Sequence, residues 1–297
     1  MSDTALAVLL ALAGGLCYAT AAVLQQRVAA QQPAELALSP RLIVRLAHRP
    51  LWLLGIGFDV SAYAFEAAAL GVGSVVVVGP VLVSSLIFAI PLATIGRRAK
   101  VTHRDMSAAV MVVIGLSVFV AVGEPRGTSS TASTAGWALA GAFVAVIATT
   151  GVVLGRRART APERALRFGL ATGALYALTA VLTKATVDLF DHGVVASLGH
   201  WQPYALVTVS VAGLVLNQSA FQAGHLAASL PAIAVTNPVL ASLLGVVLFG
   251  DRFAASGAPA VTATALAVTA MVVGTLRLAR SPLVTSVHGD GATVPIA

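Results

Sequence analysis

Two carboxylates, Asp59 and Glu66, lie within the apolar segment at residues 51–70. They are seven residues apart, so in a helix they share one face and lie about 10 Å apart along its axis. Because an ionisable side chain in an apolar helix is costly, we expect a function for it, such as binding a cation or carrying a proton. We favour this role for Asp59 over a structural hydrogen bond. Glu66 is nearer the end of the segment. The sequence favours a functional role and simple contact with water equally for this residue.

The segment around these acids is one of many that are long enough to cross a membrane. The chain is 58% hydrophobic and 10% charged, with a mean hydropathy of +0.92, whereas soluble domains carry about 25% charged residues. A helix crosses the hydrocarbon core with about 20 apolar residues. We therefore predict an all-α polytopic membrane protein with nine transmembrane helices, at residues 4–24, 51–70, 75–95, 105–122, 136–154, 168–189, 204–221, 226–249 and 257–276.

Most basic residues lie on one side of these spans. Of the 18 Lys and Arg residues, 15 fall between spans one and two, three and four, five and six, or after span nine. Cytoplasmic loops retain Lys and Arg, so we expect a plasma-membrane protein with an external N-terminus and a cytoplasmic C-terminus. The net charge of +7 then follows from topology. Since no basic stripe carries interleaved aromatic residues, we expect no nucleic-acid partner.

The first cytoplasmic connection, residues 25–50, is long and polar. Ser39 and Pro40 are typical of a helix N-cap followed by proline at the first helical position. A short helix on the inner membrane surface and an irregular loop are equally open here. Two sets of residues near span ends are predicted to meet the membrane interface or, for the glutamines, to form a polar vestibule. They are Trp52, Trp137 and Trp201, and Gln25, Gln26, Gln218 and Gln222.

The chain repeats itself at an offset of 158 residues. Six of ten residues at 15–24 are identical to those at 173–182, and five of seven at 80–86 are identical to those at 238–244. The copies are spans one to four and spans six to nine, joined by span five, which inverts the second copy. Inverted repeats place a solute site near the membrane midplane, between the two copies. The domains expected are residues 1–122, a linking region at 123–167, residues 168–280, and a disordered tail at 281–297.

The repeat pairs several polar residues and prolines across the two copies. Asp59 falls on Asn217, which adds an amide oxygen to the predicted site, and Tyr18 falls on Tyr176. Pro80 and Pro238 also correspond, and each removes a backbone hydrogen bond within a span. Carbonyl groups freed in this way are tolerated where they line a cavity. These residues complete the candidate site.

The second copy also resembles a known family. The stretch Asn217–Gly224, the Asn237-Pro238 pair and the closing Gly250-Asp251-Arg252 resemble the drug/metabolite transporter superfamily, EamA-like, and its NIPA-type magnesium-transporter branch. The resemblance implies a ten-helix or reduced nine-helix fold with two inverted halves. The chain departs from the ten-helix pattern at residues 25–50, which are too polar to cross the membrane.

Three functions stay open. The first is secondary transport of a small solute, a metabolite or drug-like compound. The second is divalent-cation transport, with Asp59, Glu66 and Asn217 supplying oxygen ligands for Mg²⁺. The third is a non-transporting scaffold. Because motifs for metalloprotease, nucleotide-phosphate and serine-nucleophile chemistry are absent, we expect neither an enzyme nor a cofactor nor ATP-driven transport. A homodimer is one option for the assembly.

Overall fold

The computed structural model describes residues 3–73, 75–95, 100–123, 125–126, 132–190, 197–224, 226–250, 252–253 and 257–281. The predicted external loop at 127–131 and the predicted tail beyond residue 281 lie outside these ranges. Within them, nine helical segments are long and apolar enough to cross a bilayer. The protein is therefore a polytopic α-helical membrane protein.

The helices follow the predicted spans closely but extend beyond most of them. Their bounds are α1 Asp3–Ala29, α2 Pro40–Ala47, α3 Pro50–Val72, α4 Val75–Val83, α5 Ser85–Thr94, α6 His103–Gly123, α7 Thr134–Arg156, α8 Ala161–Phe190, α10 Gln202–Gln222, α11 Leu226–Phe249 and α12 Ala258–Ala279. A 3₁₀ turn at Ala34–Leu36 precedes α2. Two short strands, β1 Pro125–Arg126 and β2 Arg252–Phe253, pair antiparallel.

The third predicted span is not one helix but two. The break between α4 and α5 falls at Ser84, whose hydroxyl donates to the carbonyl of Val81 at 2.5 Å. Pro80 lies within α4, and its missing N–H frees the carbonyl of Val76, one turn before it, rather than a group at Ser84. In the second copy, by contrast, α11 continues through Pro238 as a single helix. Pro80 lies inside α4 and Pro238 inside α11, so neither predicted helix break falls at its proline.

The short helix α2 settles one open question of the sequence. Ser39 is its N-cap, with a side chain that accepts a hydrogen bond from the backbone N–H of Arg41, and Pro40 occupies the first turn. Leu42 and Leu46 are fully buried in a core cluster, whereas the arginines of α2 face outward. The amphipathic helix, rather than the irregular loop, is confirmed.

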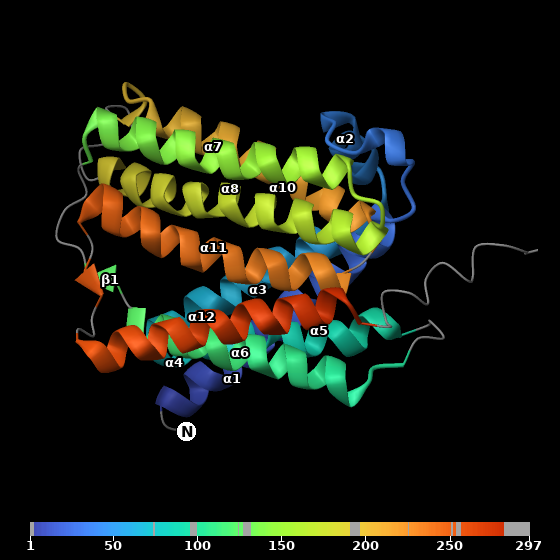
Figure 1. The fold of residues 1–297 in the computed structure, drawn as a ribbon, viewed down its shortest axis with the longest axis horizontal. Coiled ribbons are helices and arrows are strands. Elements are labelled where there is room, and N and C mark those ends of the chain that lie inside the picture. The colour runs from blue at the N-terminus through green and yellow to red at the C-terminus, as the bar shows by residue number, and fades with distance from the viewer. Residues whose placement is uncertain are drawn as a thin grey trace, which may run out of the picture.

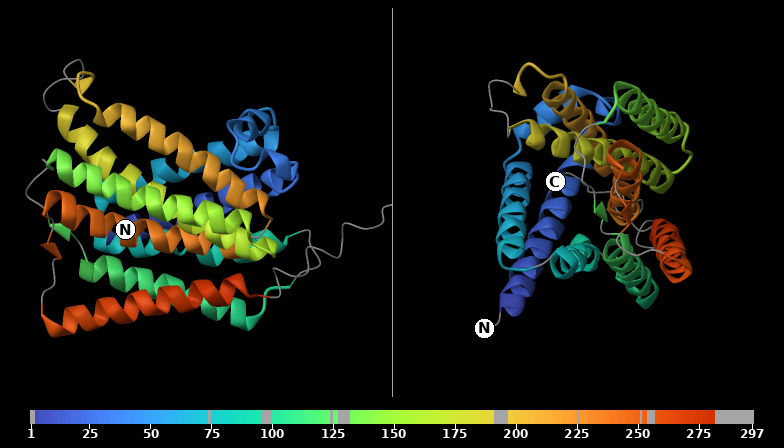
Figure 2. Two further views of the ribbon diagram at one scale, coloured as in Figure 1. Left: turned by 45° about the horizontal axis from the view of Figure 1, so that its top comes forward. Right: turned by 90° about the vertical axis from the view of Figure 1, so that its left-hand side faces the viewer.

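The helices form two groups, which we call the first half (α1 and α3–α6) and the second half (α8 and α10–α12). In the first half, α1 packs against α3, α4 and α5; in the second, α8 packs against α10 and α11, and α7 covers its other side. The two halves meet along α6 and α12 and where α1 contacts α10. The long helices lie side by side along one axis, with α2 at one end of the molecule and β1 at the other (Figures 1 and 2).

The contact between α6 and α12 depends on small residues. A Cβ atom at Gly115 of α6 would lie 2.8 Å from the carbonyl oxygen of Ala267, and one at Gly274 of α12 would lie 2.8 Å from that of Ala108. Both distances are too short for a side chain, so the two backbones approach as closely as only glycine permits. This pairing holds the halves together beside the cavity described below.

Candidate functional site

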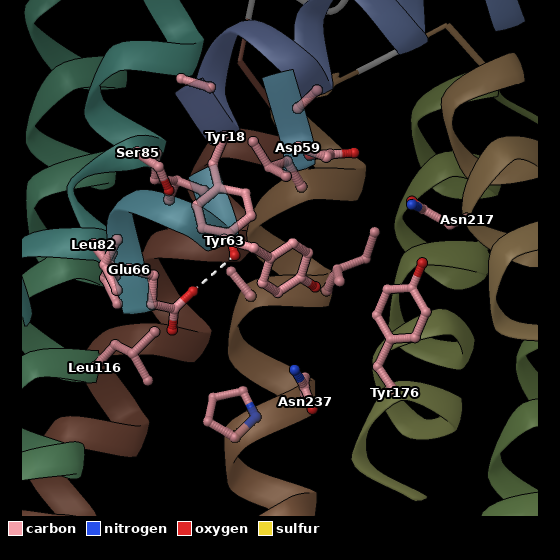
Figure 3. Close-up of a pocket in the computed structure, with 18 of the residues that line it drawn as sticks. Tyr18, Asp59, Tyr63, Glu66, Leu82, Ser85, Leu116, Tyr176, Asn217 and Asn237 are labelled. Carbon is pink, nitrogen blue, oxygen red and sulfur yellow. Dashed lines mark hydrogen bonds between the residues drawn. The ribbon is translucent and has the colours of Figure 1, made fainter. Parts of the chain in front are cut away.

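A cavity of about 830 Å³ lies between the two halves and is lined by residues of both. Its first-half wall includes Tyr18 of α1 with Asp59 and Glu66 of α3 (Figure 3). Its second-half wall includes Tyr176 of α8 and Asn217 of α10. The structure thus brings all five predicted solute- or proton-binding residues onto one cavity, whose volume is in the range that holds small ligands. We call it the central cavity.

Proline shapes one wall of the central cavity. Pro238 lines it, and because proline has no backbone N–H, the carbonyl of Ala234 loses its usual helical hydrogen bond. Ala234 also lines the cavity. In the first half Gly79, the counterpart of Asn237 in the repeat, lines the cavity, while the side chain of Pro80 lies outside the described part of the chain.

The central cavity offers acceptors and negative charge. Its described lining contains two acids, Asp59 and Glu66, and no Lys, Arg or His. The Oδ1 atoms of Asn217 and Asn237 are buried and have no hydrogen-bond partner within the described residues. A buried acceptor without a donor is costly in free energy. A bound solute that carries positive charge and N–H donors would satisfy both features.

Glu66 is held within the first half. The hydroxyl of Tyr18 donates to Glu66 Oε2 at 2.8 Å, so a helix α1 side chain orients a helix α3 carboxylate (Figure 3). The ring of Tyr18 also packs edge-on against Tyr63, with centroids 5.5 Å apart. Tyr63 also lines the cavity and is 65% exposed.

Asp59 is connected to the second half through a chain of hydrogen bonds. The amide of Gln25 donates to Asp59 Oδ2 at 2.5 Å, and its Oε1 accepts from Gln218 Nε2 at 2.8 Å. Gln218 Oε1 in turn accepts from the indole N–H of Trp52 at 3.1 Å. Gln25, Gln218 and Trp52 are 3%, 0% and 5% exposed.

The sequence-based interpretation of these side chains was wrong in part. Gln218 and Trp52 were predicted to meet a vestibule or the membrane interface, yet both are buried between helices. Gln25 is also buried, but it lines the central cavity. Trp137 is likewise 8% exposed and packs edge-on against Phe249, while Trp201 is 49% exposed. A position near the end of a span fits both an interface anchor and a contact between helices, and only the packing distinguishes them.

Tyr63 and Asn237 are cavity residues that the sequence analysis did not single out as site residues. Tyr63 is four residues after Asp59 and three before Glu66, which is the spacing of one helical face. Asn237 directly precedes Pro238, so its position next to a proline within a span was a usable signal. In Figure 3, Asn237 and Tyr176 lie on the same side of the cavity, with the Tyr176 hydroxyl pointing toward Asn217.

The described residues contain no group of three or more His, Cys, Asp or Glu side chains arranged to hold a metal ion. The three expected ligands of a magnesium site, Asp59, Glu66 and Asn217, all line the cavity. The two carboxylates, however, have different hydrogen-bond partners and lie about 10 Å apart along α3. In this conformation they do not converge on one octahedral ion.

Comparison with known proteins finds a relative of similar length. The chain is 31% identical over 282 residues to an uncharacterized protein of Corynebacterium glutamicum, in an alignment that covers 95% of this chain and 97% of the relative. No protein-family model matches the chain. No solved structure matches it either. The extent and identity of the alignment show that the chain belongs to the same family as the Corynebacterium glutamicum protein.

Proposed function

We propose that this protein is a secondary transporter of a small cationic organic solute, such as an amine, and that the central cavity is its binding site. The observation that carries the proposal is the lining of the cavity. It combines Asp59 and Glu66 with buried amide oxygens of Asn217 and Asn237 that have no partner within the described residues, and it includes no basic described residue. The aromatic faces of its tyrosines add a favourable contact for a cation.

The arrangement of the halves supports transport over a scaffold role. A scaffold has no need for a cavity of about 830 Å³ that is lined by the acids of one half and the amide side chains of the other. Helix α1 packs against α3–α5 as α8 packs against α10 and α11. This correspondence fits two inverted repeats, an arrangement that permits alternating access. We propose this mechanism, membership of the drug/metabolite transporter superfamily, and a plasma-membrane location with the α2 end in the cytoplasm.

Transport of magnesium is a second candidate, because the same oxygens are ligands that a hard cation accepts. The separate hydrogen-bond partners of Asp59 and Glu66 favour the organic cation. A large cavity with acids at different depths suits an extended solute better than a single ion.

The test is uptake by proteoliposomes that contain the purified protein. A panel of labelled solutes would include primary amines, quaternary ammonium compounds, neutral sugars and carboxylates, with magnesium followed by an entrapped fluorescent indicator. We expect uptake of at least one cationic organic solute above protein-free liposomes. Exclusive uptake of magnesium would favour the second candidate, and uptake of carboxylates alone would contradict a site built from acids.

A further inference from the structure

The last turn of α10 is bound to the first half through three side chains. Gln218 is joined to Gln25 and Trp52, as described above. Ser219 accepts from the backbone N–H of Leu38 at 2.9 Å. Gln222 Nε2 donates to the carbonyl oxygens of Pro33, at 2.5 Å, and Gln32, at 3.4 Å. All of these bonds lie at the α2 end of the central cavity.

The segment that receives these bonds, residues 30–39, connects α1 to α2, and we call it the strap. Leu38 of the strap has a positive φ of 62°, a conformation that is unfavourable for a residue with a side chain. It is maintained because its N–H is bonded to Ser219 and its side chain packs with Phe168 and Leu216 of the second half. The strap of the first half therefore takes its shape from the second half.

The chain of hydrogen bonds from Trp52 to Asp59 links the α2 end of the cavity to the binding site. Gln25 has one amide group to share: its nitrogen faces Asp59 in the cavity, and its oxygen faces Gln218 in α10. A cation that binds Asp59 competes with the Gln25 nitrogen for the same carboxylate. Because the amide group is planar, a rotation that moves its nitrogen away from Asp59 also moves its oxygen away from Gln218.

We propose that Trp52, Gln218, Gln25 and Asp59 form a lock that closes the α2 end of the cavity. Gln25 is the positioning residue: when a cation binds Asp59, Gln25 is displaced and its bond to Gln218 of α10 breaks. This inference rests on the proposed function, because it identifies Asp59 as the solute-binding carboxylate. In the structure the lock is closed and the strap lies against α10. Binding of a cation at Asp59 releases α10 from the first half and opens the cavity at this end.

The experiment measures the distance between the halves at the α2 end, without any transported solute. Spin labels are placed in a Cys17→Ser background at Val44→Cys of α2, which is 60% exposed, and at Thr160→Cys before α8, which is also exposed. Distances are recorded in lipid nanodiscs by double electron–electron resonance. Gln218→Leu and Asp59→Ala both remove a link of the lock. Trp52→Phe, which removes only one donor, serves as the milder variant.

We expect a mainly short distance in the labelled parent and a longer-distance population that rises about fivefold when one hydrogen bond of ordinary strength is lost. Glu66→Ala, which removes the other cavity acid, and Gln31→Leu, an exposed glutamine on the strap, should leave the distances unchanged. An increase with Gln218→Leu but not with Asp59→Ala would overturn the link to the cavity. Unchanged distances in Gln218→Leu and Trp52→Phe would overturn the lock itself.

Transport by the same proteins separates the two proposals. If the distances respond as expected but no solute from the panel is taken up, the lock stands as a structural closure and the proposed function fails. If a cation is taken up but the distances do not respond, the function stands and the lock fails. Size-exclusion profiles in detergent identify any variant that has not folded.

Discussion

The two walls of the central cavity differ in charge and in packing. Helix α3 of the first half carries both acids and packs one face against α1, while its other face is open, with Val60 63% exposed and Tyr63 65% exposed. Helix α8 of the second half contributes a neutral tyrosine, and its alanines Ala171, Ala174 and Ala177 are fully buried. Charge therefore lies on the more exposed wall, and small buried residues lie on the other. Changes of charge on α3 should therefore alter function, while small changes of volume on α8 should alter folding.

The largest effect is expected at Asp59. Asp59→Asn keeps the size of the side chain but removes the charge that attracts a cation, and hydrogen bonds to charged groups contribute about 1.5–3 kcal/mol. We expect uptake of the cationic solute in proteoliposomes to fall about 100-fold, with an unchanged unfolding temperature in detergent. A variant that kept full uptake would return Asp59 to a structural role.

A smaller loss is expected at Glu66, the acid held within the first half. Glu66→Gln retains an acceptor for the Tyr18 hydroxyl but removes the charge. The concentration of solute at half-maximal uptake should rise about tenfold, as expected for the loss of one charged contact. Tyr18→Phe is the control for orientation alone and should have a weaker effect. Equal losses in both variants would show that the hydrogen bond, rather than the charge, matters.

On the second-half wall the expected effect is on stability. A Cβ atom at Gly173 of α8 would lie 2.6 Å from Thr236 Cβ of α11, so Gly173→Ala must force the helices apart. Overpacking of this kind costs about 1–3 kcal/mol of the free energy of unfolding. Denaturation in mixed micelles measures it. A variant as stable as the parent would show that α8 is not the rigid wall.

The same substitution on α3 should be nearly silent. At Gly57 an added Cβ atom meets nothing within 4 Å, and alanine favours a helix over glycine by about 1 kcal/mol. Gly57→Ala should therefore be as stable as the parent or more stable by up to about that amount. Destabilisation in the same micelle assay would mean that α3 is packed against a further helix, for example that of a second copy.

The sequence predicted the helices well because their signal is simple: long apolar runs are long enough to span a bilayer. It also predicted that Asp59, Tyr18 and Tyr176 belong to one site, because helical spacing and the repeat relate them. The break at Ser84 was not predictable, because the prolines of both copies carry the same local signal and only one copy breaks. The bonds of Gln25, Gln218 and Trp52 depend on which helices become neighbours, and periodicity along one helix does not contain that information.

The most direct test asks whether the central cavity is reached from both sides of the membrane. Asn237 lines the cavity, so Asn237→Cys in a Cys17→Ser background reports access to a membrane-impermeant, positively charged thiol reagent. The reagent is applied to right-side-out and to inside-out vesicles. Alternating access predicts labelling from both sides, with Asp59→Ala increasing the rate from the α2 side. Labelling from one side only, at a rate that Asp59→Ala does not change, would contradict the account.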